Sequence, residues 1–479
     1  MPFIAQYTIR SKQSYIFRTN AMREITGASA LISGVWGMLF DAAENAGMKV
    51  KRLDNNSPDF PKDPADAFRD GQNMVDLFRG GGNDTVLFKD RRCFELANRA
   101  FSRKIMMECP GMVPLAVGVE TGHNYIADYS ALMKKLDTEK NRMVMADSNA
   151  MLPFSLMDRK TFQPITNNLN GEELSAESYA KRKYFNSNEI NDPAVSDLDK
   201  LITMENKSLL AVIHADGNNM GVKIQRLLDG KTGYDECIPL MRQFTEDTSR
   251  VFSYEGAEFP ERALMRWIVN DGDDATVVCE AKDAEAIAEA YLKKVSGSAS
   301  LDGKFSYSSC AGICIFHSHF PFSSAYALAE DACASAKKKA HPEDGSVPEV
   351  AWIDYHFIHR GVGGDLESIR SEHGTADRMA RPLGVLCDEN EHFTVDNMRA
   401  LYSALNRHGV TKTNIKAIGL EWERSTGDGM NELRRIFFRA PDLKGELLRI
   451  FDTETDILKA IYDISEVIDI EWFKDSGKG

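Results

Sequence analysis

One order of elements occurs twice along the 479-residue chain, and this recurrence limits the possible folds more than any other feature. In each copy an apolar strand is followed by helical spacing, a hairpin with a glycine-containing turn, a further helix and a further strand. The first copy runs through 3–9, 15–40, 74–90, 91–107 and 113–120, and the second through 208–216, 224–253, 262–280, 283–295 and 305–316. The order predicts two βαββαβ units that arose by internal duplication.

The rest of the chain follows a different pattern. Residues 136–205 are polar and weakly periodic, which predicts an irregular insert or linker. From about residue 361 the apolar spacing becomes helical, with a Thr394 cap and a Gly409 stop around one segment. We therefore expect an α+β protein with a first domain at 1–135, the insert at 136–205, a second domain at 206–360 and a helical domain at 361–479.

Composition excludes several classes of protein. The net charge of −14 argues against a long nucleic-acid groove, because such grooves depend on many Lys and Arg contacts to phosphate. The eight cysteines form no CxxC pair, which argues against a zinc knuckle. The sequence contains no run of 18 apolar residues, so we expect no membrane-spanning helix. The start of the chain lacks the apolar core of a secretory signal, so we expect a cytoplasmic protein.

Three acidic residues follow or precede the apolar strands of the second copy. Asp216 ends one strand and is followed by Gly217, while Asp273 and Asp274 lie in a hairpin turn after Gly272. If the two strands are neighbours, the carboxylates converge and repel one another unless a cation is bound. Magnesium or manganese would fit oxygen ligands of this kind, and a pair of such ions can drive nucleotidyl transfer.

An ordinary structural role for these motifs stays open. Asp, Asn and Gly are the usual residues of tight turns, so DGNN and NDGDD taken separately are more typical of hairpin turns than of a site. Their position at the ends of two Val/Ile-rich strands, with a lysine-ended helix following, favours the metal site.

These segments resemble a known family, the palm-domain subunits of type III CRISPR effector complexes (Cas10/Cmr2-like). HADGNNMG (214–221) is similar to a first acidic motif of that family, and NDGDDA (270–275) is similar to its GGDD hairpin. The segments 309–340 and 352–358 resemble its following strand, lysine-ended helix and next strand. The first half resembles the degenerate first palm of the family through 15–32 and 78–88.

The resemblance implies two ferredoxin-like palms and the conversion of ATP into a cyclic or linear oligonucleotide signal for antiviral defence, read by a nucleotide-sensing effector. It implies Asp216, Asp273 and Asp274 as catalytic residues. It implies a two-metal site for Mg²⁺ or Mn²⁺ formed by Asp216, Gly217, Asp273 and Asp274. It implies nucleotide contacts from Asn218, Asn219, Gly272 and Lys337. Other subunits of an effector complex, or RNA, are the implied partners, with no membrane.

Two positions depart from the family pattern. Asn218 stands where the family has a second acid, and Asp271 stands where GGDD has its first glycine. Both leave open a catalytically altered nucleotide sensor, or a scaffold subunit of a ribonucleoprotein complex. GGGN (80–83) carries no acid, so we expect the first palm to be inactive. Because the chain starts directly with the first palm, we expect a stand-alone relative without the family's HD nuclease domain.

Overall fold

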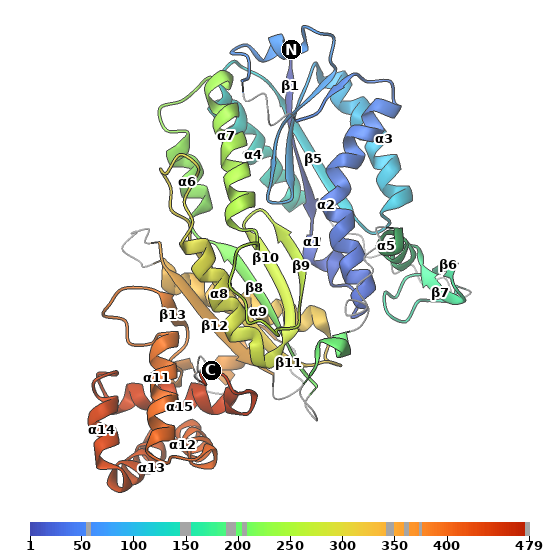
Figure 1. Cartoon of the computed structure of the whole chain (residues 1–479). Helices are drawn as coiled ribbons and strands as arrows, with labels where there is room; N and C mark the ends of the chain where they lie inside the picture. Colours follow the sequence, from blue (N-terminus) through green and yellow to red (C-terminus); the bar gives the residue numbers. More distant parts are fainter. Residues whose placement is uncertain are drawn as a thin grey trace. The chain divides into compact units, whose positions relative to one another are not determined.

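The computed structural model describes residues 1–53, 59–143, 155–187, 198–203, 208–341, 349–358, 364–372 and 376–474. The chain forms two compact units. Unit 1 comprises residues 1–198, 219–253 and 268–273, and unit 2 comprises residues 199–218, 254–267 and 274–479 (Figure 1). Unit 1 therefore contains segments of both copies seen in the sequence, whereas unit 2 contains segments of the second copy only.

Unit 1 contains a five-stranded sheet with the order β2-β3-β4-β1-β5. Its elements are β1 (Phe3–Arg10), α1 (Lys12–Ile16), α2 (Met22–Asn45), β2 (Val50–Lys51), β3 (Met74–Gly80), β4 (Asn83–Phe88), α3 (Arg91–Glu108), β5 (Val113–Glu120), α4 (Tyr125–Arg142), β6 (Ile165–Leu169), β7 (Glu172–Ser175), α5 (Ala176–Ser187), α6 (Met220–Leu227) and α7 (Tyr234–Val251). The order β3-β4-β1-β5 is that of a ferredoxin-like βαββαβ sheet, as predicted.

Helices cover both faces of this sheet (Figure 1). Successive residues of β1 point to opposite faces, so Tyr7 packs against Trp36 of α2 and Phe101 of α3, whereas Ile4 belongs to a second core. That second core includes residues of α4 and α7, among them Leu132 and Met241. The helices after β8 thus complete the core around the first sheet.

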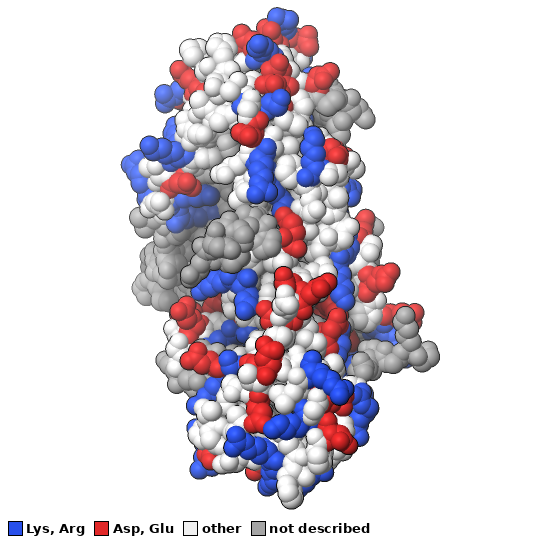
Figure 2. All heavy atoms as spheres, turned by 90° about the vertical axis from the view of Figure 1, so that its left-hand side faces the viewer, with Lys and Arg blue, Asp and Glu red and all other residues white. Residues whose placement is uncertain are grey.

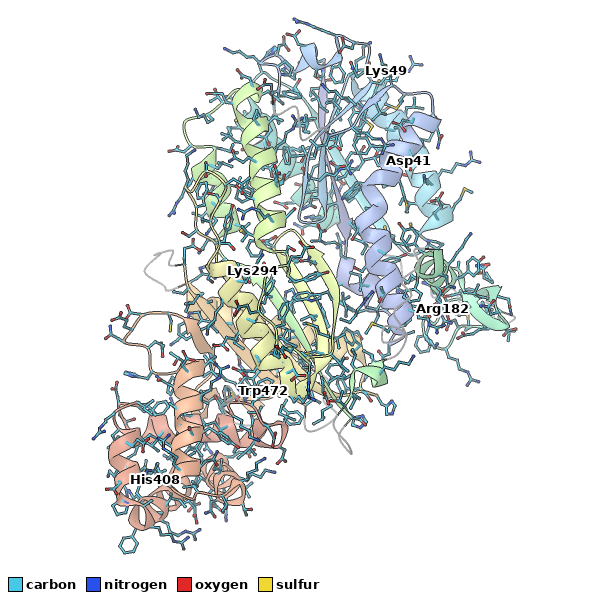
Figure 3. All side chains as sticks on the ribbon, viewed as in Figure 1. Asp41, Lys49, Arg182, Lys294, His408 and Trp472 are labelled. Atoms are coloured by element: carbon cyan, nitrogen blue, oxygen red, sulfur yellow. The ribbon has the colours of Figure 1, made fainter. Side chains whose placement is uncertain are left out.

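The segment predicted as an irregular insert is largely ordered where the structure describes it. Residues 165–175 form the hairpin of β6 and β7, and α5 follows at once. Buried charges hold α5 on α2: Arg182, labelled in Figure 3, bonds Glu24 at 2.8 Å. Sequence periodicity could not reveal this arrangement, because α5 is anchored by charged rather than apolar residues.

A six-stranded sheet with the order β13-β12-β11-β8-β10-β9 lies mostly in unit 2. The elements of this region are β8 (Leu209–Gly217), β9 (Met265–Asp271), β10 (Asp274–Glu280), α8 (Ala284–Ser296), β11 (Ser309–His317), α9 (Phe322–Ala340), β12 (Ala351–Phe357), α10 (Leu366–Glu372), β13 (Leu383–Leu386), α11 (Val395–Arg407), α12 (Lys412–Arg424), α13 (Thr426–Arg439), α14 (Pro441–Leu447) and α15 (Glu454–Val467). The order β11-β8-β10-β9 again follows the ferredoxin-like pattern.

Helix α9 lies close against this sheet at a glycine. A Cβ added to Gly312 of β11 would stand only 2.0 Å from the Ala329 carbonyl oxygen, so only glycine allows this approach. The even-numbered residues of β11 therefore face α9, and so do their cross-strand partners on β8, His214 and Asp216. The helix–sheet contact positions the lysine-rich end of α9 beside the end of β8.

The C-terminal region is helical from α11 to α15, as predicted, but it also contains a strand, β13, that the sequence did not indicate. β13 pairs with β12 and so extends the sheet. Buried charges connect this region to the sheet: Arg381 lies over the Tyr355 ring at 4.3 Å, and the Asp463 carboxylate accepts hydrogen bonds from the backbone N–H groups of Ala380 and Arg381.

One helix of the described residues, α2, is long and apolar enough to cross a membrane by length and composition alone. Its most apolar 18-residue window is 67% buried inside the structure. The core helix of a globular unit meets the same criteria, and α2 contributes Trp36 to such a core.

The buried carboxyl of Asp463 predicts a pH-dependent stability. Burial raises the pKa of Asp463 to about 7, although Arg381 opposes the shift. The folded state thus holds this proton more tightly than the unfolded state, and stability falls as the pH rises from about 4 to about 7. Asp463→Asn should keep an acceptor for the two N–H groups and flatten this dependence, by at most about 1.4 kcal/mol per pH unit. Urea unfolding across this pH range measures the effect, and Asp377→Asn, at an exposed position, is the control. If the free energy of unfolding of Asp463→Asn and of the wild type changes with pH in parallel, the prediction is wrong.

Candidate nucleotide and metal site

Strand pairing sets two carboxylates side by side in unit 2. Asp274 of β10 is the direct cross-strand partner of Asp216 of β8, and Cys310 of β11 is the partner of Asp216 on its other side. Directly opposed residues of an antiparallel pair project from the same face, with Cβ atoms about 4.5–5.5 Å apart. Two acids at this spacing repel each other unless a positive charge lies between or beside them.

Lys337 supplies such a charge. Its ammonium contacts the Asp216 carboxylate and also donates a hydrogen bond to the Gly217 carbonyl oxygen at 2.9 Å. Lys337 lies in the last turn of α9 and remains about a quarter exposed, with 23% of its side chain accessible. The cation therefore occupies a cluster of oxygen atoms that solvent can reach.

The other lysines of this turn point elsewhere, as successive residues on a helix do. Lys338 lies 3.9 Å from Glu367, whereas Lys339 lies 3.9 Å from Glu391 and over the Trp352 ring at 5.5 Å. Lys337 alone of the three is directed at Asp216.

His214 is buried on the same face of the sheet as Asp216, two residues earlier on β8. Burial lowers the pKa of His214 to about 4, an effect that Lys337 reinforces and Asp216 opposes. The imidazole packs edge-on against Tyr326 and lies 3.4 Å from the Thr276 hydroxyl. It is therefore neutral near pH 7 and leaves Lys337 as the cation nearest to Asp216 on this face. The sequence had given no signal for His214, because a single histidine inside an apolar strand is usually a core residue.

Asn218 lies inside unit 2 rather than on its surface. Its side chain is fully buried, and its amide nitrogen donates to the Ser308 hydroxyl at 3.0 Å and the Val350 carbonyl oxygen at 2.8 Å. These bonds tie the end of β8 to the segments before β11 and β12. The residue that replaces the family's second acid thus has a structural role, and its burial does not suit the nucleotide contact that the resemblance implied. Asn219 follows in the left-handed conformation, with φ 59°, and precedes α6.

The turn between β9 and β10 contains Gly272 and Asp273, and both residues belong to unit 1. A Cβ added to Gly272, which has φ +66°, would stand 2.6 Å from the Cα of Gly81. The two glycine-containing turns therefore touch backbone to backbone. Asp273 lines a pocket of about 190 Å³ together with Gly80 and Gly81. Asp273 lies in the turn itself, whereas Asp274 is the first residue of β10.

Asp271, the second departure from the family pattern, has a counter-charge. The Lys12 ammonium donates to the Gly81 carbonyl oxygen at 3.2 Å, and both Lys12 and Asp271 border the space beside Gly82. Burial raises the pKa of the Asp271 carboxyl, and the nearby Lys12 opposes this shift. Lys12 is the first residue of α1 and lies in no recognisable motif, so the sequence did not indicate it.

The sequence predicted that Asp216, Asp273 and Asp274 converge on a metal ion. Within the described part of the chain, no group of three or more His, Cys, Asp and Glu side chains is placed to hold a metal ion. The structure instead offers the facing pair Asp216 and Asp274 with the Gly217 carbonyl oxygen. Magnesium usually binds through one or two carboxylates, water and substrate phosphates, so this smaller set of hard oxygen ligands fits such an ion.

The sheet order and the acid-bearing strand ends define a palm-type domain. Residues 209–345 match the family described as Cas10/Cmr2, second palm domain. No curated protein matches the chain.

Solved structures give the same fold. The apo Csm1–Csm4 cassette and the cassette in complex with pppApApA each superpose with a TM-score of 0.54 at 11% identity, covering 97% of this chain and 69% of the matched chain. Csm1 in T. onnurineus gives a TM-score of 0.52 at 12% identity, covering 99% and 70%. The family match thus covers the second palm, and the solved structures show the same fold over nearly the whole chain.

Because the two turns touch, we expect a methyl group on Gly272 to lower the stability of the protein. Gly272→Ala should destabilise the protein by roughly 1–3 kcal/mol more than Gly230→Ala, because the new Cβ would overlap the Gly81 backbone. Gly230 is the matched control, since it has a similar φ of +70° but nothing within 4 Å of the added Cβ. Chemical unfolding of both variants measures the difference, and equal losses would show that the turns do not touch.

Proposed function

We propose that the chain is a metal-dependent nucleotidyltransferase that joins ATP into a cyclic or linear oligoadenylate signal. The observation that carries the proposal is the facing pair Asp216 and Asp274, with Lys337 bound to Asp216 and to the Gly217 carbonyl oxygen. This arrangement brings acidic oxygens and a mobile cation to one solvent-accessible strand end. Nucleotidyl transfer requires both, because an anionic triphosphate has to be held beside metal-binding carboxylates.

In the proposed reaction, the 3′-hydroxyl oxygen of one nucleotide forms a bond to the α-phosphorus of another, the bond to the bridging oxygen breaks, and pyrophosphate leaves. Bound Mg²⁺ or Mn²⁺ would activate the hydroxyl and offset charge on the leaving group. Asp216, Asp274 and the Gly217 carbonyl would hold the ions. Lys337 would exchange its contact with Asp216 for the β- and γ-phosphates, as a lysine on a flexible stem can do.

The pocket of unit 1 beside Asp273 is suited to a base. Its walls are mainly apolar, with Phe78, Met241 and Phe244 among them, and Gln6 and Thr85 add polar groups. Gln6 and Thr85 are already linked by a hydrogen bond of 2.7 Å, which fixes their orientation. An apolar slot with few oriented polar groups is the usual form of a small-ligand site.

The proposed partners are nucleoside triphosphates and other subunits of a type III CRISPR effector complex, in the cytoplasm. Structures similar to this fold contain Csm1 with Csm4, one of them with pppApApA. Figure 2 shows lysine and arginine interspersed with acidic residues on the face in view, without a continuous basic track. Assembly through protein subunits therefore suits this surface better than a long RNA groove.

A nucleotide sensor without catalysis is the second candidate, because Asn218 replaces an acid and its side chain is committed to internal hydrogen bonds. The two candidates differ in a single outcome. The enzyme binds ATP and releases pyrophosphate, whereas the sensor binds ATP and leaves it unchanged.

The facing acids predict the effect of removing either charge. Asp216→Asn and Asp274→Asn should each lower the formation of oligonucleotide from labelled ATP with Mg²⁺ or Mn²⁺ by about 100-fold or more, a typical loss for a charged group that stabilises the transition state. Asp302→Asn, in a surface turn where Asp302 pairs with Lys304, is the control. Tight ATP binding without product in the wild-type protein, alone and with candidate effector subunits, would leave the sensor as the function.

Because Lys337 is directed at Asp216 and Lys339 is not, we expect their substitutions to differ in their effect on ATP binding. Lys337→Ala should weaken binding of ATP with Mg²⁺ by about tenfold, the loss expected for one charge-assisted contact of about 1.4 kcal/mol. Lys339→Ala removes the same charge from the same helical turn but not from the Asp216 side. Calorimetric titration of both variants separates a phosphate contact from a general charge effect, and equal affinities would remove Lys337 from the site.

A further inference from the structure

A second pocket of unit 1 takes no part in the proposed chemistry. It lies along α2, between α5 and the end of α3, and encloses about 620 Å³. This volume is within the usual range for binding pockets. Its lining includes Met106, Met107, Glu108, Tyr179, Lys183 and Tyr184. We call it the methionine–tyrosine groove.

One wall of the groove is held rigidly. Helix α5 approaches α2 so closely that a Cβ on Gly27 would stand 2.0 Å from the Lys181 carbonyl oxygen. The buried Lys181 ammonium bonds Glu177 at 2.6 Å, and the neighbouring Arg182 bonds Glu24 of α2. Buried and hydrogen-bonded ion pairs of this kind are costly to separate. Tyr179 and Tyr184 of α5 are therefore presented to the groove in a fixed position.

The opposite wall is apolar and exposed. Met106 and Met107, at the end of α3, keep 77% and 71% of their surface accessible. Two adjacent methionines at this exposure are unfavourable unless something covers them. Methionine side chains adapt to different partners because they are unbranched and polarizable, and they are common on docking surfaces for helices.

Positive charge flanks the groove although the chain as a whole carries −14. The Lys183 ammonium lies 6.0 Å from the Tyr179 ring centroid. Arg99 and Arg103 are exposed on the turns of α3 that precede Met106. Glu108 is the one acid of the lining. Methionine, tyrosine and arginine are the residues enriched in protein–protein interfaces, and lysine and arginine here attract acidic groups.

We propose that the methionine–tyrosine groove docks an amphipathic helix of a partner protein, with apolar anchors in the groove and acidic residues facing Lys183, Arg99 and Arg103. The mainly apolar lining favours a protein helix over RNA, which would need contacts along its phosphates. A helix carries anchors at i, i+3, i+4 and i+7 on one side and leaves its other positions free for acids. This docking surface is independent of the proposed nucleotide chemistry.

A labelled synthetic helix tests the proposal with the full chain. The probe is an amphipathic peptide of about 18 residues, long enough to be helical, with leucine anchors on one face and glutamate on its borders. The full chain should bind it, and Met106→Glu should weaken binding at least about tenfold. Phe438→Glu is the matched control, since Phe438 is an equally exposed apolar residue, at 88%, on α13 in unit 2. Arg103→Glu should weaken binding several-fold at low salt and much less at high salt.

Three comparisons can overturn the proposal. A scrambled peptide of equal composition should bind at least about tenfold more weakly, and equal binding would mean charge attraction alone. Oligouridylate of matched charge should not displace the helix, and competition would assign the surface to RNA. No binding of the helical peptide by the wild-type chain, or equal binding by Met106→Glu and the wild type, would refute docking in this groove. Circular dichroism of each variant confirms that it is folded.

Discussion

The antiparallel register of β8 determines what the second palm can do. Because β8 lies between β10 and β11, each of its inward residues has two fixed neighbours, and for Asp216 these are Asp274 and Cys310. A register shift of one residue would turn Asp216 to the other face of the sheet, away from α9 and Lys337. The register is held by the apolar residues between these ends, such as Val212 opposite Val278, which are fully buried. The charged end of the sheet therefore depends on the packing of its apolar centre.

Sequence reasoning found the features that local residue patterns determine. The two βαββαβ sheets follow from strand and helix periodicity. Helical spacing predicts that the three lysines at the end of α9 point in different directions, whereas the family resemblance singled out Lys337. It could not find contacts made between segments distant in sequence. Lys12 near Asp271, and Arg381 against Tyr355 and Asp463, carry no local signal. The short strand β13 was missed because four residues show no measurable period, and α5 because its anchoring residues are charged.

The two departures from the family pattern have different physical consequences. Asn218 exchanges a carboxylate for an amide that can donate, and its bonds to Ser308 and Val350 both use that donor. An aspartate there would face acceptors instead, including the Val350 carbonyl, so the surroundings of Asn218 are matched to the amide. Asp271 instead adds a partly buried acid beside the Lys12 ammonium, where burial raises the pKa of the carboxyl and Lys12 opposes this shift. The first change alters the strand end itself, whereas the second is compensated by a residue from the start of the chain.

The two palms differ in the cation that lies beside the acids nearest the hairpin turn. In each sheet one cross-strand pair lies nearest the hairpin turn: Asp216 with Asp274 in the second palm, and Tyr7 with Asp84 in the first. Asp84 is fully buried, and burial together with the neighbouring Asp76 raises its pKa, against the opposing effect of Arg79. Arg79 lies 2.6 Å from Asp76 and 3.2 Å from Asp84 and so already provides a permanent cation. In the second palm the corresponding cation is Lys337, a flexible and partly exposed side chain from a different element. A site that must release one cation to bind another can use such a lysine, but not an arginine held between two buried acids.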